Sequence, residues 1–370
     1  MSINLNDYSL HIGHITTDYL PITGGAEAYV NDLINILQPA EQMIYQLDTG
    51  IVANNIRPVW HLPEGIRRRS SDVWLYGLFL MRYIKELKHQ DALIIHYGLY
   101  YPLLSWHSKS VVVSHGVEWI VPPNTISHRI RKWAAKKAFK SACSLVANDS
   151  DFYRQMGLNI APGEALFQEV APGRWFIPNC VDTDIFKPTV VMPELKDIKA
   201  ILVPRNIHPR RGVHLAVRAL PRILQAHPEL KLVIAGQFVD HAYRTQIVHT
   251  IDELKLHDSI IFLGSVPRQD MPLLYSSTLL TVVPSILGEG TSLAALESMA
   301  CGTPTISTSI GGLADLPTEK CLPDERSLAE VVIDVLQRRD EVAKCQKEIV
   351  RQHFNISNWR NTWRRVLEMD

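Results

Sequence analysis

Two glutamates flank the predicted start of a helix in the segment that follows Pro284. Glu289 and Glu297 lie on either side of Gly290-Thr291-Ser292, and serine and threonine are frequent helix N-caps. The free amides at a helix N-terminus favour a phosphate, and a carboxylate can accept hydrogen bonds from both hydroxyls of a diol. Small and apolar neighbours of Glu297 predict that it is buried and needs a partner, although a surface position is the alternative. The segment predicts a site for a phosphate and for sugar hydroxyls.

Two arginines follow an expected strand in the middle of the chain. Arg205 comes just after the strand expected at 200–203, and Arg211 precedes the helix expected at 213–226. A guanidinium group binds phosphate through two parallel hydrogen bonds, so a pair of them could clamp a diphosphate. The alternative is that both are solvated loop residues, because charged side chains are common on protein surfaces.

The first half of the chain offers two further candidates. Gly24 and Gly25 precede a helix expected at 28–37, where paired glycines let backbone amides approach an anion; an ordinary helix-entry turn is the alternative. This segment lacks the GxGxxG pattern, which disfavours a nicotinamide-dependent dehydrogenase. His115 ends an apolar strand at 110–114, at the sheet edge where ligands of open α/β folds bind. A structural role for this histidine is the alternative.

Strands and helices alternate throughout both halves of the chain. Continuous apolar strands such as 110–114 and 231–235 indicate burial on both faces, and hence parallel sheets. The pattern predicts two α/β domains joined by a proline-flanked linker at 178–188. The other expected strands are 10–15, 43–47, 92–96, 144–147, 260–263, 279–283 and 305–308, and the other expected helices are 72–87, 127–141, 243–254, 271–275, 293–300 and a closing amphipathic helix at 357–367.

Composition narrows the function classes further. The 370 residues include 38 basic and 38 acidic side chains, and this neutral balance disfavours a dedicated nucleic-acid binder. The apolar stretches are too short to span a bilayer, and the first residues lack the features of a secretory signal. The five cysteines are scattered without a CxxC pair, so we expect a reducing, cytoplasmic location without a disulfide framework or a structural zinc site.

These motifs, in this order, resemble the retaining nucleotide-sugar glycosyltransferases of the GT-B fold, family 4 (glycosyl transferases group 1). The matching pieces extend from Thr23 to Asp315, and together they are far more specific than any one of them. They are GGAE at 24–27, PNCVDTDIFKP at 178–188 with Cys180 in the usual place of a glycine, FLG at 262–264, EGTSLAALESMACGTP at 289–304, and Gly311-Gly312.

The resemblance implies a fold and an activity. It implies two Rossmann-like parallel-sheet domains facing across a cleft: an N-terminal acceptor-binding domain (1–182), a C-terminal nucleotide-sugar-binding domain (183–355), and a C-terminal helix (356–370) that returns to the first domain. The implied reaction is transfer of a hexose, with retained configuration, from a UDP or GDP sugar to the hydroxyl of a sugar or lipid-linked acceptor. No cofactor beyond this donor is implied. Other GT-B enzymes, such as an epimerase or a phosphorylase, and an inactive GT-B scaffold are the competing interpretations.

The resemblance also assigns roles to residues. Arg205 and Arg211 match the family's Arg and Lys that bind the donor diphosphate, Glu297 matches the ligand of the ribose diol, and Glu289 matches the residue that contacts the transferred sugar. His115 matches a histidine that points into the cleft, and it is assigned to catalysis with Arg205, Arg211 and Glu289. EGTSL replaces the frequent EGFGL, which would alter sugar contacts. The remaining implied donor-binding residues are Gly24, Gly25, Val266, Gly290, Thr291, Ser292 and Leu293.

Two charged segments remain. Asp182-Thr183-Asp184 is a DxD string, but flanking prolines favour carboxylates that cap a turn, and we predict no catalytic metal. A basic amphipathic stretch at 129–140 can lie on an anionic membrane, and the alternative is a helix that packs on the sheet with its polar face in solvent. Its six basic residues are Arg129, Arg131, Lys132, Lys136, Lys137 and Lys140, and a further basic cluster lies at 67–69.

Overall fold

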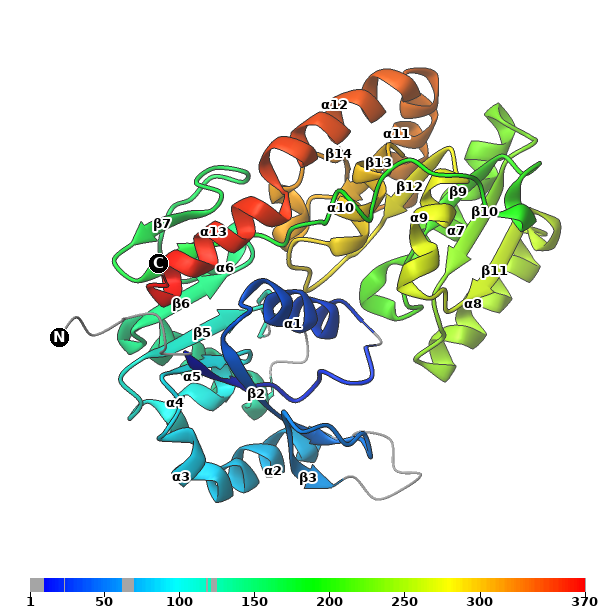
Figure 1. Cartoon of the computed structure of the whole chain (residues 1–370). Helices are drawn as coiled ribbons and strands as arrows, with labels where there is room; N and C mark the ends of the chain where they lie inside the picture. Colours follow the sequence, from blue (N-terminus) through cyan, green and yellow to red (C-terminus); the bar gives the residue numbers. More distant parts are fainter. Residues whose placement is uncertain (1–9, 23, 62–69, 118, 121–124, 370) are drawn as a thin grey trace.

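Each half of the chain folds around its own parallel β-sheet, as the alternation of strands and helices predicts (Figure 1). The computed structural model describes residues 10–22, 24–61, 70–117, 119–120 and 125–369. Thr23 and the basic cluster at 67–69 lie outside the described residues. The two sheets belong to separate domains that lie side by side, which confirms the predicted two-domain α/β class.

The first sheet has eight strands in the described part of the chain, in the order β3-β2-β1-β4-β5-β6-β8-β7. All neighbouring strands are parallel except β7 and β8, which form an antiparallel pair at one edge. The central strands are buried along almost their whole length, which explains their continuous apolar sequences. The strands are β1 (His11–Ile15), β2 (Glu41–Asp48), β3 (Ile56–His61), β4 (Ala92–Ile95), β5 (Ser110–Ser114), β6 (Ser144–Ala147), β7 (Gln168–Ala171) and β8 (Arg174–Phe176).

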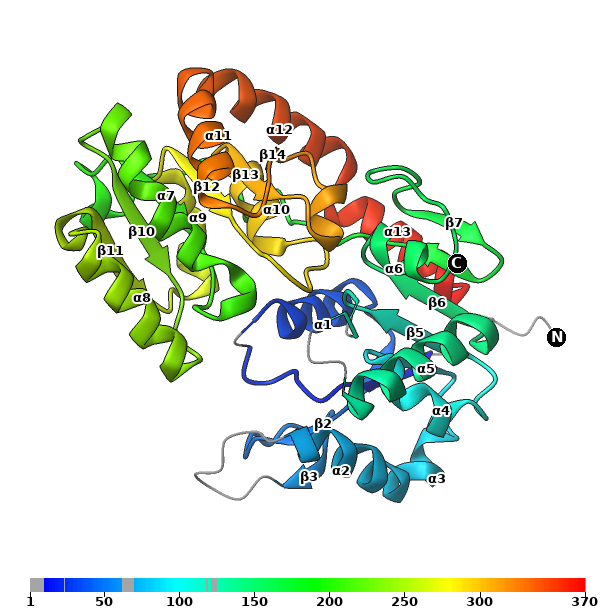
Figure 2. The ribbon, with the colours of Figure 1, turned by 180° about the vertical axis from the view of Figure 1, so that it is seen from behind.

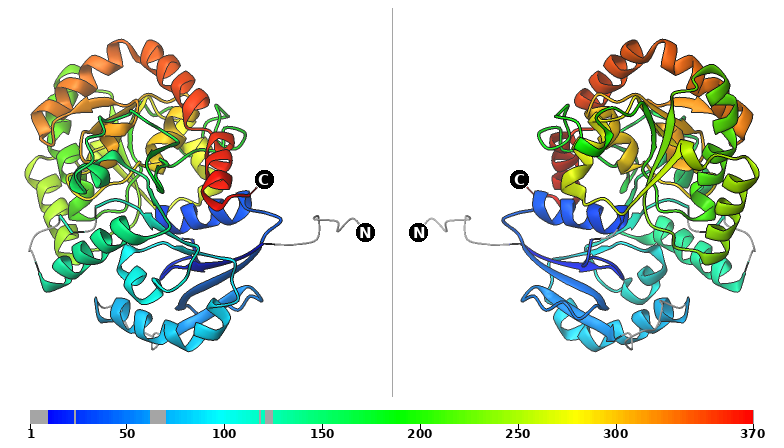
Figure 3. Two further views of the ribbon diagram at one scale, coloured as in Figure 1. Left: turned by 90° about the vertical axis from the view of Figure 1, so that its left-hand side faces the viewer. Right: turned by 90° about the vertical axis from the view of Figure 1, so that its right-hand side faces the viewer.

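Helices cover both faces of this sheet, as the edge-on views in Figure 3 show. One face packs against α1 (Gly25–Ile36) and against the last helix of the chain, α13 (Ile356–Leu367). Trp359 and Trp363 of α13 are fully buried there, so the closing amphipathic helix returns to the first domain as predicted. The other face packs against α2 (Ser70–Leu80), α3 (Ile84–Leu87), α4 (Tyr101–Leu104), α5 (Ile126–Ser141) and α6 (Ser150–Gln155).

The second sheet has six described strands, all parallel, in the order β11-β10-β9-β12-β13-β14. One face packs against α7 (Val213–Ala226), α8 (His241–Glu253) and α11 (Glu325–Gln337). The opposite face packs against α9 (Met271–Ser276), α10 (Leu293–Ala300) and α12 (Arg339–His353), and Figure 2 shows this domain from behind. The strands are β9 (Ala200–Val203), β10 (Lys231–Ala235), β11 (Ile260–Gly264), β12 (Leu280–Val283), β13 (Thr305–Thr308) and β14 (Glu319–Cys321).

The chain passes between the domains twice, and the two crossings lie against each other. The Val181 N–H donates to the carbonyl oxygen of Phe354 at 2.9 Å, and Val181 pairs in a parallel bridge with Asn355. In the same linker, the Asp182 carboxylate accepts from the Asp184 N–H at 2.9 Å, so the DxD string closes a turn as expected. No helix in the described ranges is long and apolar enough to cross a bilayer.

Several elements differ from the sequence prediction. The single helix expected over 72–87 is wrong, because a 3-10 turn at Met81–Tyr83 separates α2 from α3. At this turn the Tyr83 hydroxyl donates to the carbonyl oxygen of Pro58 on β3 at 2.9 Å, a contact that a propensity argument cannot anticipate. Strand β3 itself was not expected; it contains Pro58, which is tolerated because β3 is an edge strand. Other elements not expected are β7, β8, β14, α4, α6, α11 and α12.

Candidate active site

The carboxyl edge of the second sheet carries the predicted phosphate-binding residues. Arg205 lies two residues after β9, and Arg211 ends the 3-10 turn η5 (Pro209–Arg211), which leads into α7. Gly212 joins this turn to α7 with φ at +66°, and a Cβ there would lie 1.8 Å from the carbonyl oxygen of Pro284. Only glycine permits this approach, so the backbone brings Arg211 against the loop that follows β12.

Both guanidinium groups bind a single carboxylate, that of Glu289. Nη2 of Arg205 and Nη1 of Arg211 each donate to Oε2 of Glu289, and the Ser285 hydroxyl donates to the same oxygen at 2.9 Å. The side chains of Arg205 and Glu289 are 9% and 8% exposed, whereas that of Arg211 is 38% exposed. Burial would raise the pKa of Glu289, but the two arginines outweigh it and lower the pKa. The cluster is therefore fully charged and carries one net positive charge.

Arg205 is the more deeply placed of the two arginines. Its Nη2 donates to the Ser285 hydroxyl oxygen at 3.1 Å and its Nη1 to the Ser292 hydroxyl oxygen at 3.3 Å. Its Nε is buried and has no hydrogen-bond partner among the described residues. Burial lowers the pKa of Arg205, and the neighbouring Glu289 carboxylate partly offsets this effect. This arginine therefore retains a buried donor that the described part of the protein does not satisfy.

The N-terminus of α10 lies beside this cluster and faces the first domain. Ser292 is the N-cap of α10, and its hydroxyl oxygen accepts from the Ala295 N–H at 3.4 Å. Across the domain boundary, a Cβ on Gly25 would lie 3.8 Å from Cδ1 of Leu293. The glycine pair at the start of α1 is thus opposite the start of α10, as expected for residues on two sides of one site.

The loop before α10 is fixed by hydrogen bonds to the first domain. The Thr291 hydroxyl donates to the carbonyl oxygen of Asn148 at 3.0 Å and accepts from the Asn179 N–H at 2.8 Å. A Cβ on Gly290 would lie 2.9 Å from the carbonyl oxygen of His115 and closer still to the Asn148 side chain. The Thr291 hydroxyl therefore has both of its hydrogen bonds to the first domain. Glycine at position 290 permits the close contact between the domains, because a side chain there would collide with the first domain.

Glu297 lies one helical turn and more beyond the cap of α10, in a separate group of contacts. It is 7% exposed, which confirms the predicted burial. The Tyr275 hydroxyl donates to Oε2 of Glu297 at 3.0 Å, and Nε of Arg268 lies 3.6 Å from Oε1. Burial raises the pKa of Glu297, and Arg268 and Tyr275 oppose that effect. Arg268 also forms a paired hydrogen bond with Asp32 on α1.

His115 belongs to a row of three histidines at the carboxyl ends of β1, β4 and β5. Its ring stacks on His96 with centroids 5.7 Å apart, and it meets the Tyr29 ring edge-to-face at 4.7 Å. His96 in turn lies within hydrogen-bond distance of His14, 3.2 Å between ring nitrogens. Burial lowers the pKa of His115 to about 4, so its imidazole is neutral at physiological pH. Its Nε2 is buried without a partner among the described residues.

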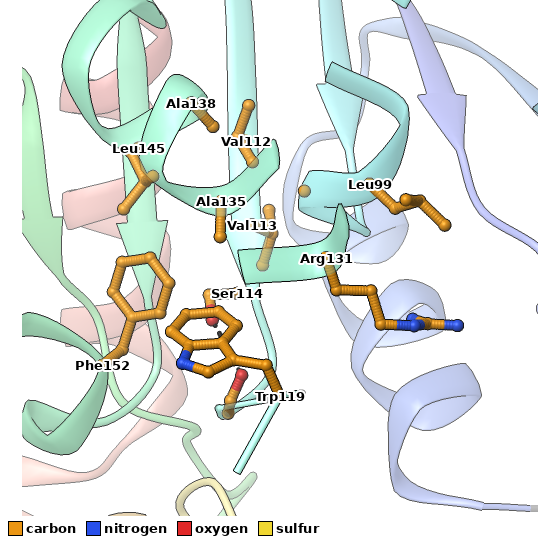
Figure 4. Close-up of a pocket in the computed structure, with 12 residues that line it drawn as sticks. Leu99, Val112, Val113, Ser114, Trp119, Arg131, Ala135, Ala138, Leu145 and Phe152 are labelled. Carbon is orange, nitrogen blue, oxygen red and sulfur yellow. Dashed lines mark hydrogen bonds between the residues drawn. The ribbon is translucent and has the colours of Figure 1, made fainter. Parts of the chain in front are cut away.

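A small apolar cavity lies beneath α5, between this helix and the first sheet (Figure 4). Val112, Leu145 and Phe152 line it, and Trp119 and Arg131 lie at its border. Its volume of about 20 Å³ is enough for one water molecule. This cavity is therefore too small to hold a nucleotide or a sugar, and its lining includes none of the predicted site residues.

The structure brings most predicted residues to one place and adds several that the sequence did not reveal. Arg205, Arg211, Glu289 and Ser292 are in direct contact, Gly290 and Leu293 adjoin them, and Val266 packs on the core of the second domain beside α9 and α10. No group of three or more His, Cys, Asp or Glu side chains in the described segments is arranged to hold a metal ion. Sequence motifs do not reveal the added residues, because their contacts join distant positions of the chain or depend on side-chain rotamers. The added residues are Asp32, Asn148, Asn179, Arg268, Tyr275 and Ser285.

Comparison with known proteins assigns the second domain to a family. Residues 192–350 match the family model described as Glycosyl transferases group 1. This match covers most of the second domain and less than half of the chain. One curated relative belongs to the phosphatidylinositol N-acetylglucosaminyltransferase of Arabidopsis thaliana and is 31% identical over 179 residues, which are 47% of this chain and 37% of that protein. The protein YtcC of Bacillus subtilis is 36% identical over 154 residues, which are 41% of this chain and 36% of that protein. The chain thus matches little more than a third of the length of these relatives.

Solved structures of similar fold cover nearly the whole chain. The sucrose-phosphate synthase of Thermosynechococcus elongatus superposes with a TM-score of 0.77 and 18% identity, over 97% of this chain and 98% of that one. Anabaena HepE, solved with UDP and glucose, gives a TM-score of 0.77 and 16% identity, over 97% and 99% of the two chains. At this level of identity the likeness shows the fold alone, and it confirms the predicted GT-B architecture with two Rossmann-like domains.

Proposed function

We propose that this protein transfers a hexose from a UDP or GDP sugar to an acceptor hydroxyl, with retained anomeric configuration. The observation that carries the proposal is the cluster of Arg205, Arg211 and Glu289 beside the N-terminus of α10, at the carboxyl edge of the second sheet. Ligands of open α/β sheets bind at this edge. The group 1 family match and the UDP–sugar complex of the similarly folded HepE support a nucleotide-sugar donor.

The charge distribution suits the departure of a diphosphate. As the bond between the sugar carbon and the β-phosphate oxygen breaks, negative charge grows on that oxygen and the sugar becomes oxocarbenium-like. Arg205, Arg211 and Glu289 together carry one net positive charge, and the backbone N–H groups at the start of α10 add hydrogen-bond donors. Removing one such preorganised donor typically costs about 2.7–4 kcal/mol in the barrier. The proposed mechanism needs no metal ion, because the two guanidinium groups and the helix terminus stabilise the leaving group.

The acceptor hydroxyl attacks from the face that the diphosphate leaves. The new bond joins the acceptor oxygen to the sugar carbon, and the acceptor proton passes to the departing phosphate. His115 is neutral because burial lowers its pKa, so it can orient a hydroxyl through one hydrogen bond but is not charged at physiological pH. In this assignment Glu289 contacts the transferred sugar and Glu297 accepts from the ribose diol.

A thermal-shift screen against UDP, GDP, ADP and their sugars tests donor binding, because a ligand of the native state raises its stability. Arg205→Ala and Glu297→Ala should abolish transfer without unfolding the protein. Arg326→Ala is the matched control, since Arg326 is 77% exposed on α11 and pairs with Glu330 one turn away. Undiminished transfer by both site variants would refute the assignment. Conversion of the donor without an acceptor would identify an epimerase, and absence of both transfer and donor hydrolysis would identify an inactive scaffold.

For the acceptor side we propose a sugar or lipid-linked acceptor, with peripheral contact of α5 to an anionic membrane. Helix α5 carries six basic residues and no acidic one, and Trp133 and Ile126 are 56% and 75% exposed on it. Trp133 lies under the Lys137 ammonium at 5.7 Å, and such amphipathic aromatic residues are frequent at membrane interfaces.

Sedimentation with vesicles of phosphatidylglycerol and phosphatidylcholine tests this contact. The double variant Lys132→Glu and Lys136→Glu reverses two exposed charges of α5 and should lose binding. The double variant Lys187→Glu and Lys344→Glu makes the same change in charge at exposed positions of the linker and the second domain and should keep binding. Equal vesicle binding by the two double variants would contradict the membrane contact.

A further inference from the structure

Arg268 connects the two domains at the side of the candidate active site. It follows β11 in the second domain, two residues after Val266. Its Nη1 and Nη2 donate to Oδ1 and Oδ2 of Asp32 at 3.0 and 2.8 Å, and Asp32 lies on α1 of the first domain. A guanidinium group that binds both oxygens of a carboxylate fixes orientation as well as distance. The pair therefore determines how α1 is placed relative to the second domain.

The same guanidinium group contacts two further parts of the chain. Its Nε lies 3.6 Å from Oε1 of Glu297 on α10. The Cζ atom of Arg268 lies 5.7 Å from the ring centroid of Phe186, a buried residue of the linker between the domains. Arg268 is 35% exposed and Asp32 is 20% exposed, so the bridge is only partly screened by water. One side chain thus joins the first domain, the linker and α10.

The contacts of Glu297 explain why this matters for a ligand. Oε2 already accepts from Tyr275, so Oε1 is the oxygen left for a diol. A separation of 3.6 Å from Nε is too long for a hydrogen bond. While Asp32 holds both terminal nitrogens of Arg268, the guanidinium cannot turn them toward Glu297. Without Asp32, the fork of Arg268 would be free to bind the Glu297 carboxylate in place of a ligand.

We propose that Arg268 is a positioning residue that couples closure of the two domains to recognition of a ribose diol. Its bridge to Asp32 holds the domains together and keeps Oε1 of Glu297 available to the diol. The coupling rests on the proposed function, because it requires Glu297 to bind the donor ribose. The bridge also positions the glycine pair relative to the start of α10, since α1 begins at this pair and Gly25 faces Leu293.

Calorimetric binding of UDP, GDP and their 2′-deoxy forms tests the proposal. The wild-type protein should bind one ribonucleotide more tightly than its deoxy form. Asp32→Asn should weaken ribonucleotide binding about tenfold, as loss of a charge-assisted contact does, and should reduce the preference over the deoxy form. Asp334→Asn is the matched control: Asp334 also binds an arginine, Arg338 at 2.8 Å, but on α11. It should leave both affinities unchanged.

A second variant separates positioning from a general structural effect. Arg268→Gln removes the charge that opposes the effect of burial on Glu297, so the pH below which ribonucleotide binding is lost should move upward. Small-angle X-ray scattering of the unliganded proteins should give a larger radius of gyration for Asp32→Asn and Arg268→Gln than for the wild type and Asp334→Asn. If Arg268→Gln does not fold, Arg268→Lys keeps the charge without the fork and should reproduce the larger radius.

The outcomes distinguish this proposal from the proposed function. If the wild type prefers the ribonucleotide but Asp32→Asn and Arg268→Gln keep its affinity, pH profile and radius, the coupling is overturned and the proposed function stands. If the wild type binds no nucleoside diphosphate, the proposed function is overturned, and the coupling, which rests on it, is overturned with it.

Discussion

The buried histidine row makes the stability of the first domain depend on pH in a way that one substitution isolates. His14 on β1 is fully buried; one ring nitrogen lies 3.0 Å from Oε1 of Gln42 and the other 3.2 Å from His96. Burial lowers the pKa of His14 from 6.5 to about 4, and the hydrogen bond to Gln42 offsets only part of this effect. The native state therefore binds the proton more weakly than the unfolded chain does.

The sign and size of the effect follow from linkage. A histidine whose pKa is lowered in the native state contributes stability at neutral pH, and this contribution is lost as the pH falls from 6.5 toward 4. For these two pKa values the loss between about pH 7.5 and about pH 5 is roughly 2 kcal/mol, and it approaches about 3.4 kcal/mol below pH 4. His14→Gln lacks this titration. The difference in free energy of unfolding between wild type and variant should thus shrink by roughly 2 kcal/mol over that range.

Urea unfolding followed by tryptophan fluorescence, at several pH values and with unchanged m-values, provides the measurement. Comparing the variant with the wild type cancels titrating groups that do not contact His14, including Asp149, whose pKa burial raises to about 8. The pKa of His96, which contacts His14, is itself lowered by burial. His249→Gln is the control, because His249 is 71% exposed on α8. A wild-type-to-variant difference that stays constant with pH would show that native His14 takes up protons as readily as an exposed histidine, and the burial argument would be wrong.

Two further substitutions test the backbone and the domain contact. Gly212→Ala places a Cβ 1.8 Å from a backbone oxygen, so it should displace Arg211, lower the melting temperature and abolish transfer. The control Gly157→Ala, at φ +93° with open space around it, should lower the free energy of unfolding by only about 1 kcal/mol and keep activity. Equal melting temperatures for the two variants would contradict the steric argument. Thr291→Val removes the hydroxyl that joins Asn148 and Asn179 and should lower the free energy of unfolding by about 1–3 kcal/mol. The control Thr245→Val, on the exposed face of α8, should change this free energy little. Equal effects of the two substitutions in a denaturant titration would refute the role of the Thr291 contact.

The sequence predicted the elements whose buried apolar residues form a clear pattern, either a continuous run in a strand or helical spacing in a helix. The bounds of β5, β6, β9, β10, α7 and α10 agree with the prediction, because each is buried enough for hydrophobicity to decide its structure. The three-residue strands β8 and β14 carry too little periodicity to stand out from loops. The 3-10 turn between α2 and α3 contacts β3 through Tyr83, and no local sequence pattern contains this contact.

The candidate site divides in the same way. The convergence of Arg205 and Arg211 follows from their positions after β9 and before α7, and the burial of Glu297 follows from its small neighbours. The partner of the two arginines could not be predicted, because Glu289 was expected to face the sugar rather than to hold both guanidinium groups. The Arg268–Asp32 bridge joins positions 236 residues apart, so only the folded arrangement of both domains reveals it.

The ion pairs of Glu289 with Arg205 and Arg211 explain how two positive charges can lie close together in this site. The buried Arg205 and the partly exposed Arg211 would repel each other without a counterion, and Glu289 neutralises one of the two charges. If the proposed donor binds here, its diphosphate shares the arginines with Glu289, so part of its binding energy is offset by the pairing that it disturbs. Glu297 is in a corresponding position, since Tyr275 and Arg268 oppose the effect of burial, which raises the pKa of its carboxylate. Under the proposed function, these charged groups are oriented by pairs that the donor has to replace.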